Sequence, residues 1–150
     1  GKQVAVLGMG DVGDNGSTYW THHVHVIDVS TGERKFKHIP QGPYKDVVNC
    51  VVWSPSSGFI AIGDAAGRIE VVEPSKRRVQ FSEKVHKDGI DALAWHPDES
   101  RLASSSEDGR VKILTAAAGQ PLRLPDVPDV ERVHVTITEL LFSEEDEDDE

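Results

Sequence analysis

The chain has 150 residues, of which 28% are charged, and its formal net charge at pH 7 is −10. Its single cysteine, Cys50, excludes a disulfide-stapled scaffold and indicates a reducing compartment, so we expect a cytoplasmic or nuclear protein. We expect neither a membrane span nor a signal peptide, because no apolar run has the required length and no such pattern opens the chain.

The first predicted strands are Gln3–Gly8 and Val24–Asp28, and Gly10–His23 between them is a predicted loop. The glycine-rich segment Gly8–Gly13 resembles a dinucleotide-binding fingerprint, in which glycines approach a pyrophosphate and a later acid binds the ribose. That motif needs a helix after its third glycine, and Asp14–Thr18 disfavours a helix. A dinucleotide-binding enzyme is therefore a distant alternative.

Three histidines, His22, His23 and His25, precede or enter the second predicted strand. The two-residue period of a strand places His23 and His25 on one face, as in many metal-binding pairs. Two histidines form an incomplete ligand set, so a solvated strand edge is the preferred interpretation. We expect no metal ion and no other cofactor.

One pattern occurs twice without a gap, at residues 49–72 and 91–114, with a spacing of 42 residues. Five residues recur unchanged: Trp53/Trp95, Pro55/Pro97, Ala61/Ala103, Gly67/Gly109 and Arg68/Arg110. A fixed period of about 40–45 residues is typical of propeller blades, which are four-stranded units that cannot bury their faces alone. The period therefore predicts an all-β fold of repeated antiparallel sheets.

Each copy contains three predicted strands separated by turns with Pro, Gly, Ser and Asp. The predicted strands are Val48–Trp53, Phe59–Gly63 and Arg68–Val72 in the first copy, and Ile90–Trp95, Arg101–Ser105 and Arg110–Leu114 in the second. Within Arg68–Val72, alternation puts Ile69 and Val71 on one face. A fourth, more polar strand is predicted at Val79–Ser82, and no segment shows a helical period.

These residues resemble the repeat core of the WD-repeat family of β-propellers. The likeness rests on Ala-Trp-His-Pro-Asp at 94–98 and on Leu-Ala-Ser-Ser-Ser-Glu-Asp-Gly-Arg-Val-Lys-Ile-Leu at 102–114, and it extends over residues 2–124. The long Gly10–His23 loop is similar to a loop of the actin-interacting protein 1 propellers. The resemblance implies about three blades within residues 1–124, at about 1–45, 46–87 and 88–124.

The resemblance also implies a structural tetrad of His, Ser, Asp and Trp that pins each blade through hydrogen bonds. In the second repeat we expect His86, Ser106 and Asp108 to form this network, with Leu114 in place of the Trp. The same three residue types occur in catalytic triads, but the buried structural network is the preferred interpretation. We therefore do not expect an enzyme.

The number of predicted blades is small for a closed ring. Propellers typically close with four to eight blades, and the first blade here lacks its innermost strand. An open stack exposes strand edges and apolar faces. We therefore expect either a piece of a larger propeller, which a start at Gly1 favours, or a half-propeller closed by self-association.

In a propeller, the loops from second to third strands and from fourth to first strands emerge on one face. On this loop face we expect the partner-binding residues Tyr19, Trp20, Tyr44, Lys45, Lys84, Lys87 and Asp88. Aromatic side chains on polar loops are typical anchors of protein interfaces, although Trp20 could instead pack on its own blade. The sequence thus predicts a non-catalytic scaffold for protein–protein interactions within a multiprotein complex.

The C-terminal part divides into a connector at residues 125–142 and a disordered acidic tail at residues 143–150. Strict alternation over Glu131–Thr138 predicts one further strand in the connector. The tail carries seven of the negative charges and leaves −3 for the rest; its acids are Glu144, Glu145, Asp146, Glu147, Asp148, Asp149 and Glu150. Ser143 in front of them resembles an acid-directed kinase site.

The tail suggests an alternative function, because a run of like charges often serves as an interaction segment. In this alternative the protein is an escort or chaperone for a basic client such as a histone or ribosomal protein. A purely solubilising tail is an equally simple interpretation. In either case the acids would repel phosphate groups, so we expect no direct nucleic-acid binding.

Overall fold

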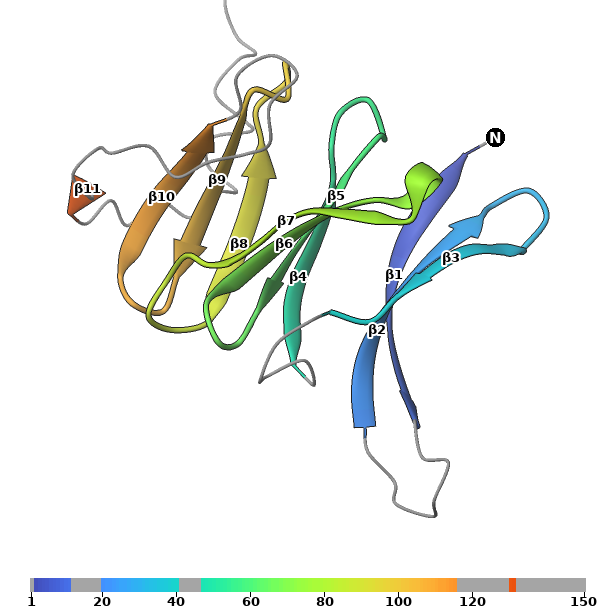
Figure 1. The fold of residues 1–150 in the computed structure, drawn as a ribbon, viewed down its shortest axis with the longest axis horizontal. Helices are drawn as coiled ribbons and strands as arrows, with labels where there is room; N and C mark the ends of the chain where they lie inside the picture. The colour runs from blue at the N-terminus through green and yellow to red at the C-terminus, as the bar shows by residue number, and fades with distance from the viewer. Residues whose placement is uncertain (1, 12–19, 41–46, 116–129, 132–150) are drawn as a thin grey trace, which may run out of the picture.

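The computed structural model describes residues 2–11, 20–40, 47–115 and 130–131, and these form three antiparallel sheets that stand side by side (Figure 1). The helical structure in these residues is a single 3₁₀ turn, η1, at Pro74–Lys76. No helix within the described ranges is long and apolar enough to cross a membrane. The all-β fold predicted from the repeat is confirmed.

Blade 1 has three strands, β1 (Gln3–Asp11), β2 (Trp20–Asp28) and β3 (Arg34–His38), in the order β1-β2-β3. β1 and β2 pair along their whole lengths. β3 was missing from the sequence prediction because four of its five residues are polar and only Phe36 is buried. What makes this segment a strand is its pairing with β2 and the packing of Phe36 against blade 2.

Blade 2 is a four-stranded meander of β4 (Val48–Trp53), β5 (Ile60–Asp64), β6 (Arg68–Glu73) and β7 (Arg78–Lys84). Blade 3 repeats it with β8 (Ile90–Trp95), β9 (Arg101–Ser106), β10 (Arg110–Thr115) and β11 (Val130–Glu131). β11 pairs with β10 and includes the first residue of the predicted strand Glu131–Thr138. The rest of the connector and the acidic tail lie outside the described residues.

The core lies between the blades, because neighbouring blades bury the faces that they turn towards each other. Between blades 1 and 2 the buried residues are Val24, Val26, Phe36, Val48, Ile60, Ile62 and Val72. Between blades 2 and 3 they are Ala61, Ile69, Val71, Phe81, Val85, Ile90, Leu93, Leu102 and Leu114. Successive residues of β5 and β6 therefore enter opposite interfaces, which is the two-residue period predicted for Ile69 and Val71.

The two ends of the stack are more open than its middle. All five residues of β5 in blade 2 are buried. On the side of blade 1 away from blade 2, Val4 and Val6 are 42% and 41% exposed, and Ile113 of blade 3 is 45% exposed. Apolar residues that a further blade would cover are thus accessible at both ends, as expected for a partial propeller.

Cys50 on β4 gives a direct test of packing around the middle blade. Its environment, chiefly burial, raises the pKa of the thiol to about 11 from 9.0. Because only the thiolate reacts, we expect alkylation at pH 8 to be about 100-fold slower in the native protein than in the unfolded chain. Iodoacetamide labelling followed by mass spectrometry, with and without guanidinium, measures this ratio; equal rates would show that the thiol is accessible.

Candidate interaction site at the loop end

Three connections of blades 2 and 3 meet at one end of the sheets, which we call the loop end (Figure 1). They are the turn Asp64–Arg68 between β5 and β6, the segment Lys84–Ile90 between β7 and β8, and the turn Ser106–Arg110 between β9 and β10. The backbone N–H groups of Val85 and His86 both donate to the carbonyl of Gly67 at 2.9 Å. The segment between the blades is therefore fixed to the turn of blade 2.

Gly67 permits this close contact. Its φ is +80°, in the left-handed region that favours glycine. A Cβ atom at this position would lie 2.4 Å from the carbonyl oxygen of His86 and 2.5 Å from that of Asp88. The repeat-equivalent Gly109 has a φ of +77°, but no described atom lies within 4 Å of its hypothetical Cβ. The recurring glycine thus has a packing role in blade 2 that has no counterpart in the described part of blade 3.

A buried network joins the segment between the blades to blade 3. The His86 side chain has no exposed surface, and its Nδ1 lies 3.0 Å from Oδ2 of Asp108. Its Nε2 lies 2.8 Å from Oγ of Ser104, which is also fully buried. The Lys87 backbone N–H donates to the same Asp108 oxygen at 2.9 Å.

The serine of this network was misassigned from the sequence. Ser106 was expected beside His86, but its Oγ donates to the backbone carbonyl of Asp88 at 3.0 Å. Ser104, two residues earlier on β9, supplies the hydroxyl that contacts His86. Both serines lie on the same face of the strand, so alternation alone does not distinguish them.

The network also affects the ionisation of Asp108. Burial by itself raises the pKa of this carboxyl, but hydrogen bonds from the Lys87 N–H and from His86 outweigh it and lower the pKa below 3.8. Asp108 is therefore an anion at neutral pH, held by several donors. Ser104 is fully buried, so its hydroxyl is not exposed to a substrate. We therefore interpret this Ser–His–Asp set as a structural network that joins the segment between the blades to blade 3.

The residues predicted to bind partners are only partly described. Lys84, Lys87 and Asp88 are exposed and lie together in the segment between β7 and β8 at the loop end. Trp20 is the first residue of β2, and its side chain is not described. Tyr19, Tyr44, Lys45 and the acidic tail Glu144–Glu150 lie outside the described residues, so their roles stay predictions.

The glycine-rich segment that resembles a dinucleotide-binding motif begins within a β-strand. β1 continues through Gly8 and Gly10 as a strand that pairs antiparallel with β2, which is not the parallel crossover of a dinucleotide-binding unit. Residues 12 and 13 of that motif are outside the described ranges.

The three histidines of β2 contact neighbouring groups of the protein or are buried. Nδ1 of His22 accepts the Val48 backbone N–H at 2.8 Å. His23 is buried, and a Cβ on Gly8 would lie 2.9 Å from Cδ2 of His25. Burial first, and then neighbouring cations, lower the pKa of both His23 and His25. No group of three metal-ligating side chains occurs in the part of the chain that the structure describes.

A second, basic surface is present that the sequence did not predict. β3 and the η1–β7 connection bring five Lys and Arg residues together at the outer rim of blades 1 and 2; they are Arg34, Lys35, Lys37, Arg77 and Arg78. The signals that could have found it are the short basic runs at 34–37 and 76–78. Nothing in the sequence indicates that these two runs lie side by side.

Comparisons with known proteins agree with this architecture. The family model described as anaphase-promoting complex subunit 4 WD40 domain matches residues 51–144. A search of curated protein sequences finds no match. Many solved chains are similar in structure.

Two of these solved chains show the degree of likeness. A chain in the crystal structure of the mitotic checkpoint complex has a TM-score of 0.58 at 18% identity, with 75% of this chain and 29% of that chain covered. The β-propeller domain of Myceliophteria thermophila Cps50 (Swd1) has a TM-score of 0.55 at 17% identity, with 71% and 39% covered. The chain thus spans well under half of either neighbour, and these likenesses show the fold alone. Because the family model covers more than half of its length, the chain belongs to the family of anaphase-promoting complex subunit 4 WD40 domains, within the WD-repeat β-propellers.

Proposed function

We propose that this protein is a non-catalytic scaffold that binds another protein through its loop end. WD40 propellers generally mediate protein–protein interactions and are typically not enzymes. The observation that carries the proposal is the segment between β7 and β8, which hydrogen bonds to Gly67 and to the His86 network hold from both sides. It keeps Lys84, Lys87 and Asp88 exposed on a fixed backbone, so little conformational entropy is lost on binding.

We propose a partner within a multiprotein complex, in the cytoplasm or the nucleus. The family name refers to a subunit of the anaphase-promoting complex, and one structural neighbour is part of the mitotic checkpoint complex. Both are multiprotein assemblies by name, which supports a subunit role here.

We expect Tyr19→Ala with Trp20→Ala to abolish partner binding, since aromatic anchors dominate the energy of many interfaces. The melting temperature should stay within about 2 °C of the parent, because on this proposal both side chains face the partner and contribute little to packing within the protein. Partner capture from cell extract and thermal unfolding by circular dichroism measure the two effects. A large fall in melting temperature would show that the pair packs on its own blade.

The acidic tail favours one second candidate, an escort for a basic client, because residues 144–150 hold seven consecutive acids. Capture with the intact chain and with a chain ending at Ser143, both at physiological salt, separates the two functions. A captured set that is basic and disappears on truncation supports the escort. A set that survives truncation but is lost in the Tyr19 and Trp20 variant supports the scaffold function, with these two aromatic residues as part of the binding surface.

A further inference from the structure

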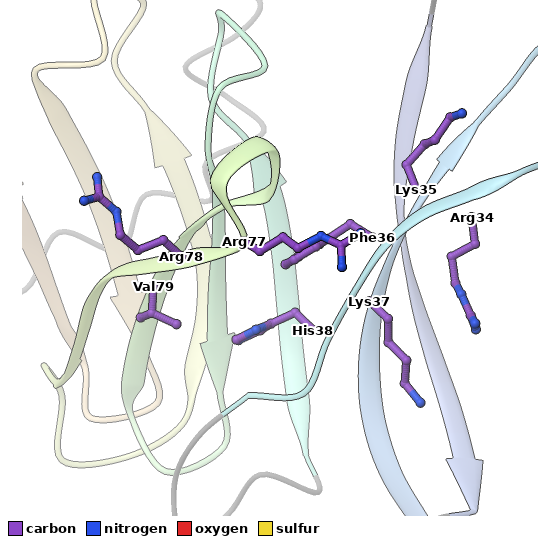
Figure 2. Close-up of a pocket in the computed structure, with 8 residues that line it drawn as sticks. All are labelled: Arg34, Lys35, Phe36, Lys37, His38, Arg77, Arg78 and Val79. Atoms are coloured by element: carbon purple, nitrogen blue, oxygen red, sulfur yellow. The ribbon is translucent and has the colours of Figure 1, made fainter.

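A groove with a volume of about 440 Å³ separates the outer strands of blades 1 and 2. It lies away from the loop-end segment of β7–β8, and its walls are β3 on one side and the η1–β7 connection on the other (Figure 2). The lining residues are Arg34, Lys35, Phe36, Lys37 and His38 from β3, and Arg77, Arg78 and Val79 from the second wall. Five of these eight carry a fixed positive charge.

Acids of the same region neutralise only part of this charge. Lys35 pairs with Glu33 at 2.6 Å and Arg78 with Glu73 at 3.3 Å. Within the described residues, no ion pair is formed by the other three cations: Arg34, Lys37 and Arg77. The groove therefore keeps a net positive charge.

The base of the groove is firmly built. His38 Nε2 lies 2.8 Å from Oε2 of Glu70, whose side chain is 2% exposed, and this contact joins β3 to β6 across the two blades. The Phe36 and His38 rings lie nearly parallel, with centroids 6.1 Å apart. β3, which forms one wall, is thus fixed to blade 2 by a buried contact.

The cations lie on both faces of β3. His38 and Phe36 point towards blade 2, whereas Lys37 is opposite His25 on the far face of the sheet (Figure 2). Burial and then the charges of Arg34 and Lys37 lower the pKa of His25. The positive charge of these two residues therefore acts on the far face as well. On the near side, Arg77 extends from η1 towards β3 (Figure 2).

β3 and β7, which contribute to the two walls, are edge strands of their sheets among the described residues. The backbone edge of such a strand can pair with an added extended segment, and side chains on the two faces then select its sequence. Successive residues of an extended segment point to opposite faces. A segment that matches this groove therefore carries acids at consecutive positions, which a single alternating stripe would not provide.

We propose that the groove binds the chain's own acidic segment, Glu144–Glu150, in an extended form. Its seven consecutive acids place carboxylates on both faces of an added strand. Twelve residues separate it from Glu131, the end of β11, and these can span up to about 40 Å, whereas packed sheets lie about 10 Å apart. Tethering at this length gives an effective concentration in the millimolar range, so the segment outcompetes an equally charged free peptide.

This inference goes beyond the proposed function, because it gives the tail an intramolecular site distinct from the loop end. A basic client would have to compete with the groove for the acidic segment before it could bind. The tail contact would then be available only to partners whose affinity exceeds that of the groove.

The test uses a fluorescein-labelled synthetic peptide of residues 143–150 and measures its anisotropy against full-length chains. One chain is unmodified, and in another every acid of 144–150 is replaced by Gln or Asn. We expect the peptide to bind the neutralised chain at least 10-fold more tightly than the unmodified chain. Lys37→Gln with Arg77→Gln in the neutralised chain should weaken binding at least 10-fold, and 0.5 M salt should remove most of it.

A matched control is Lys2→Gln with Arg101→Gln, which removes the same charge at exposed positions that do not line the groove. This pair should leave the affinity unchanged, and circular dichroism checks that each variant is folded. Equal affinity for the unmodified and neutralised chains would overturn the proposal, because the groove would then be free of the chain's own segment. Equal losses from the two Gln pairs, or no binding at all, would overturn it too. None of these outcomes depends on the loop end, so the proposed function is tested separately.

Discussion

His86→Ala is expected to lower the free energy of unfolding by about 3 kcal/mol. The substitution leaves a cavity where a fully buried ring stood, and it strands the Asp108 carboxylate and the Ser104 hydroxyl without this partner. Leaving a buried hydrogen-bonding group without its partner costs about 1–3 kcal/mol, the lost packing of the ring adds to this, and the remaining donors to Asp108 reduce the loss. Urea unfolding monitored by tryptophan fluorescence gives the change.

The chain contains a matched control for this effect. His96 Nδ1 lies 2.7 Å from Oδ1 of Asp98, but these side chains are 42% and 58% exposed. Exposed ion pairs contribute little because water solvates either charge when the other is removed. His96→Ala should therefore leave the unfolding midpoint nearly unchanged. Equal losses from the two His substitutions would show that the buried network does not stabilise the blade.

The same network predicts a loss of stability in acid. The pKa of Asp108 is lowered on folding, so its contribution is fully present above the unfolded value of 3.8. That contribution is lost as the pH falls through the lower folded value. Stability measured between pH 2 and pH 6 should therefore fall less steeply in Asp108→Asn than in the parent; parallel curves would contradict this role.

Gly67→Ala is expected to destabilise the protein by about 4 kcal/mol, the second large effect. The left-handed backbone alone costs a non-glycine residue about 1–2 kcal/mol. The new Cβ would also lie within 2.5 Å of the carbonyl oxygens of His86 and Asp88, so the connection between the blades must move and its hydrogen bonds to Gly67 must stretch. Backbone atoms at such distances do not relax as a flexible side chain would.

Gly109→Ala separates the two contributions. It is the same residue of the next repeat, with nearly the same φ, and no described atom lies near its Cβ position. Its cost should be the backbone strain alone, about 1–2 kcal/mol. Chemical unfolding of both variants gives the difference of about 2–3 kcal/mol that we assign to contact between blades. Equal costs would mean that the connection adapts freely.

The folding of blades 2 and 3 follows from local sequence. Val48–Trp53 and Ile90–Trp95 are strands with the predicted bounds, and Phe59–Gly63 is displaced by one residue to Ile60–Asp64. Turn residues and alternating apolar positions act over a few residues, and the period of 42 residues repeats them. These signals were sufficient to predict blades, their strand order and the likeness to WD repeats.

Tertiary structure decided what depends on contacts between blades. β3 is a strand because Phe36 finds a buried site on blade 2, which its basic neighbours do not suggest. Ser104, not Ser106, contacts His86 of the segment between β7 and β8, while Ser106 donates to the carbonyl of Asp88 in the same segment. The two serines have the same local pattern, so their roles depend on register between segments distant in the chain.

The sequence by itself therefore determined the repeat, the blade as its folding unit and the charge of the tail. The rim groove was decided only by packing, because it brings Arg34–His38 beside residues 77–79 of the next blade, while the His38–Glu70 contact ties β3 to β6 of that blade. Each basic run taken alone is an ordinary solvated strand end. Their sum becomes a concentrated positive field because the apolar cores stack the blades face to face and leave their outer strands side by side.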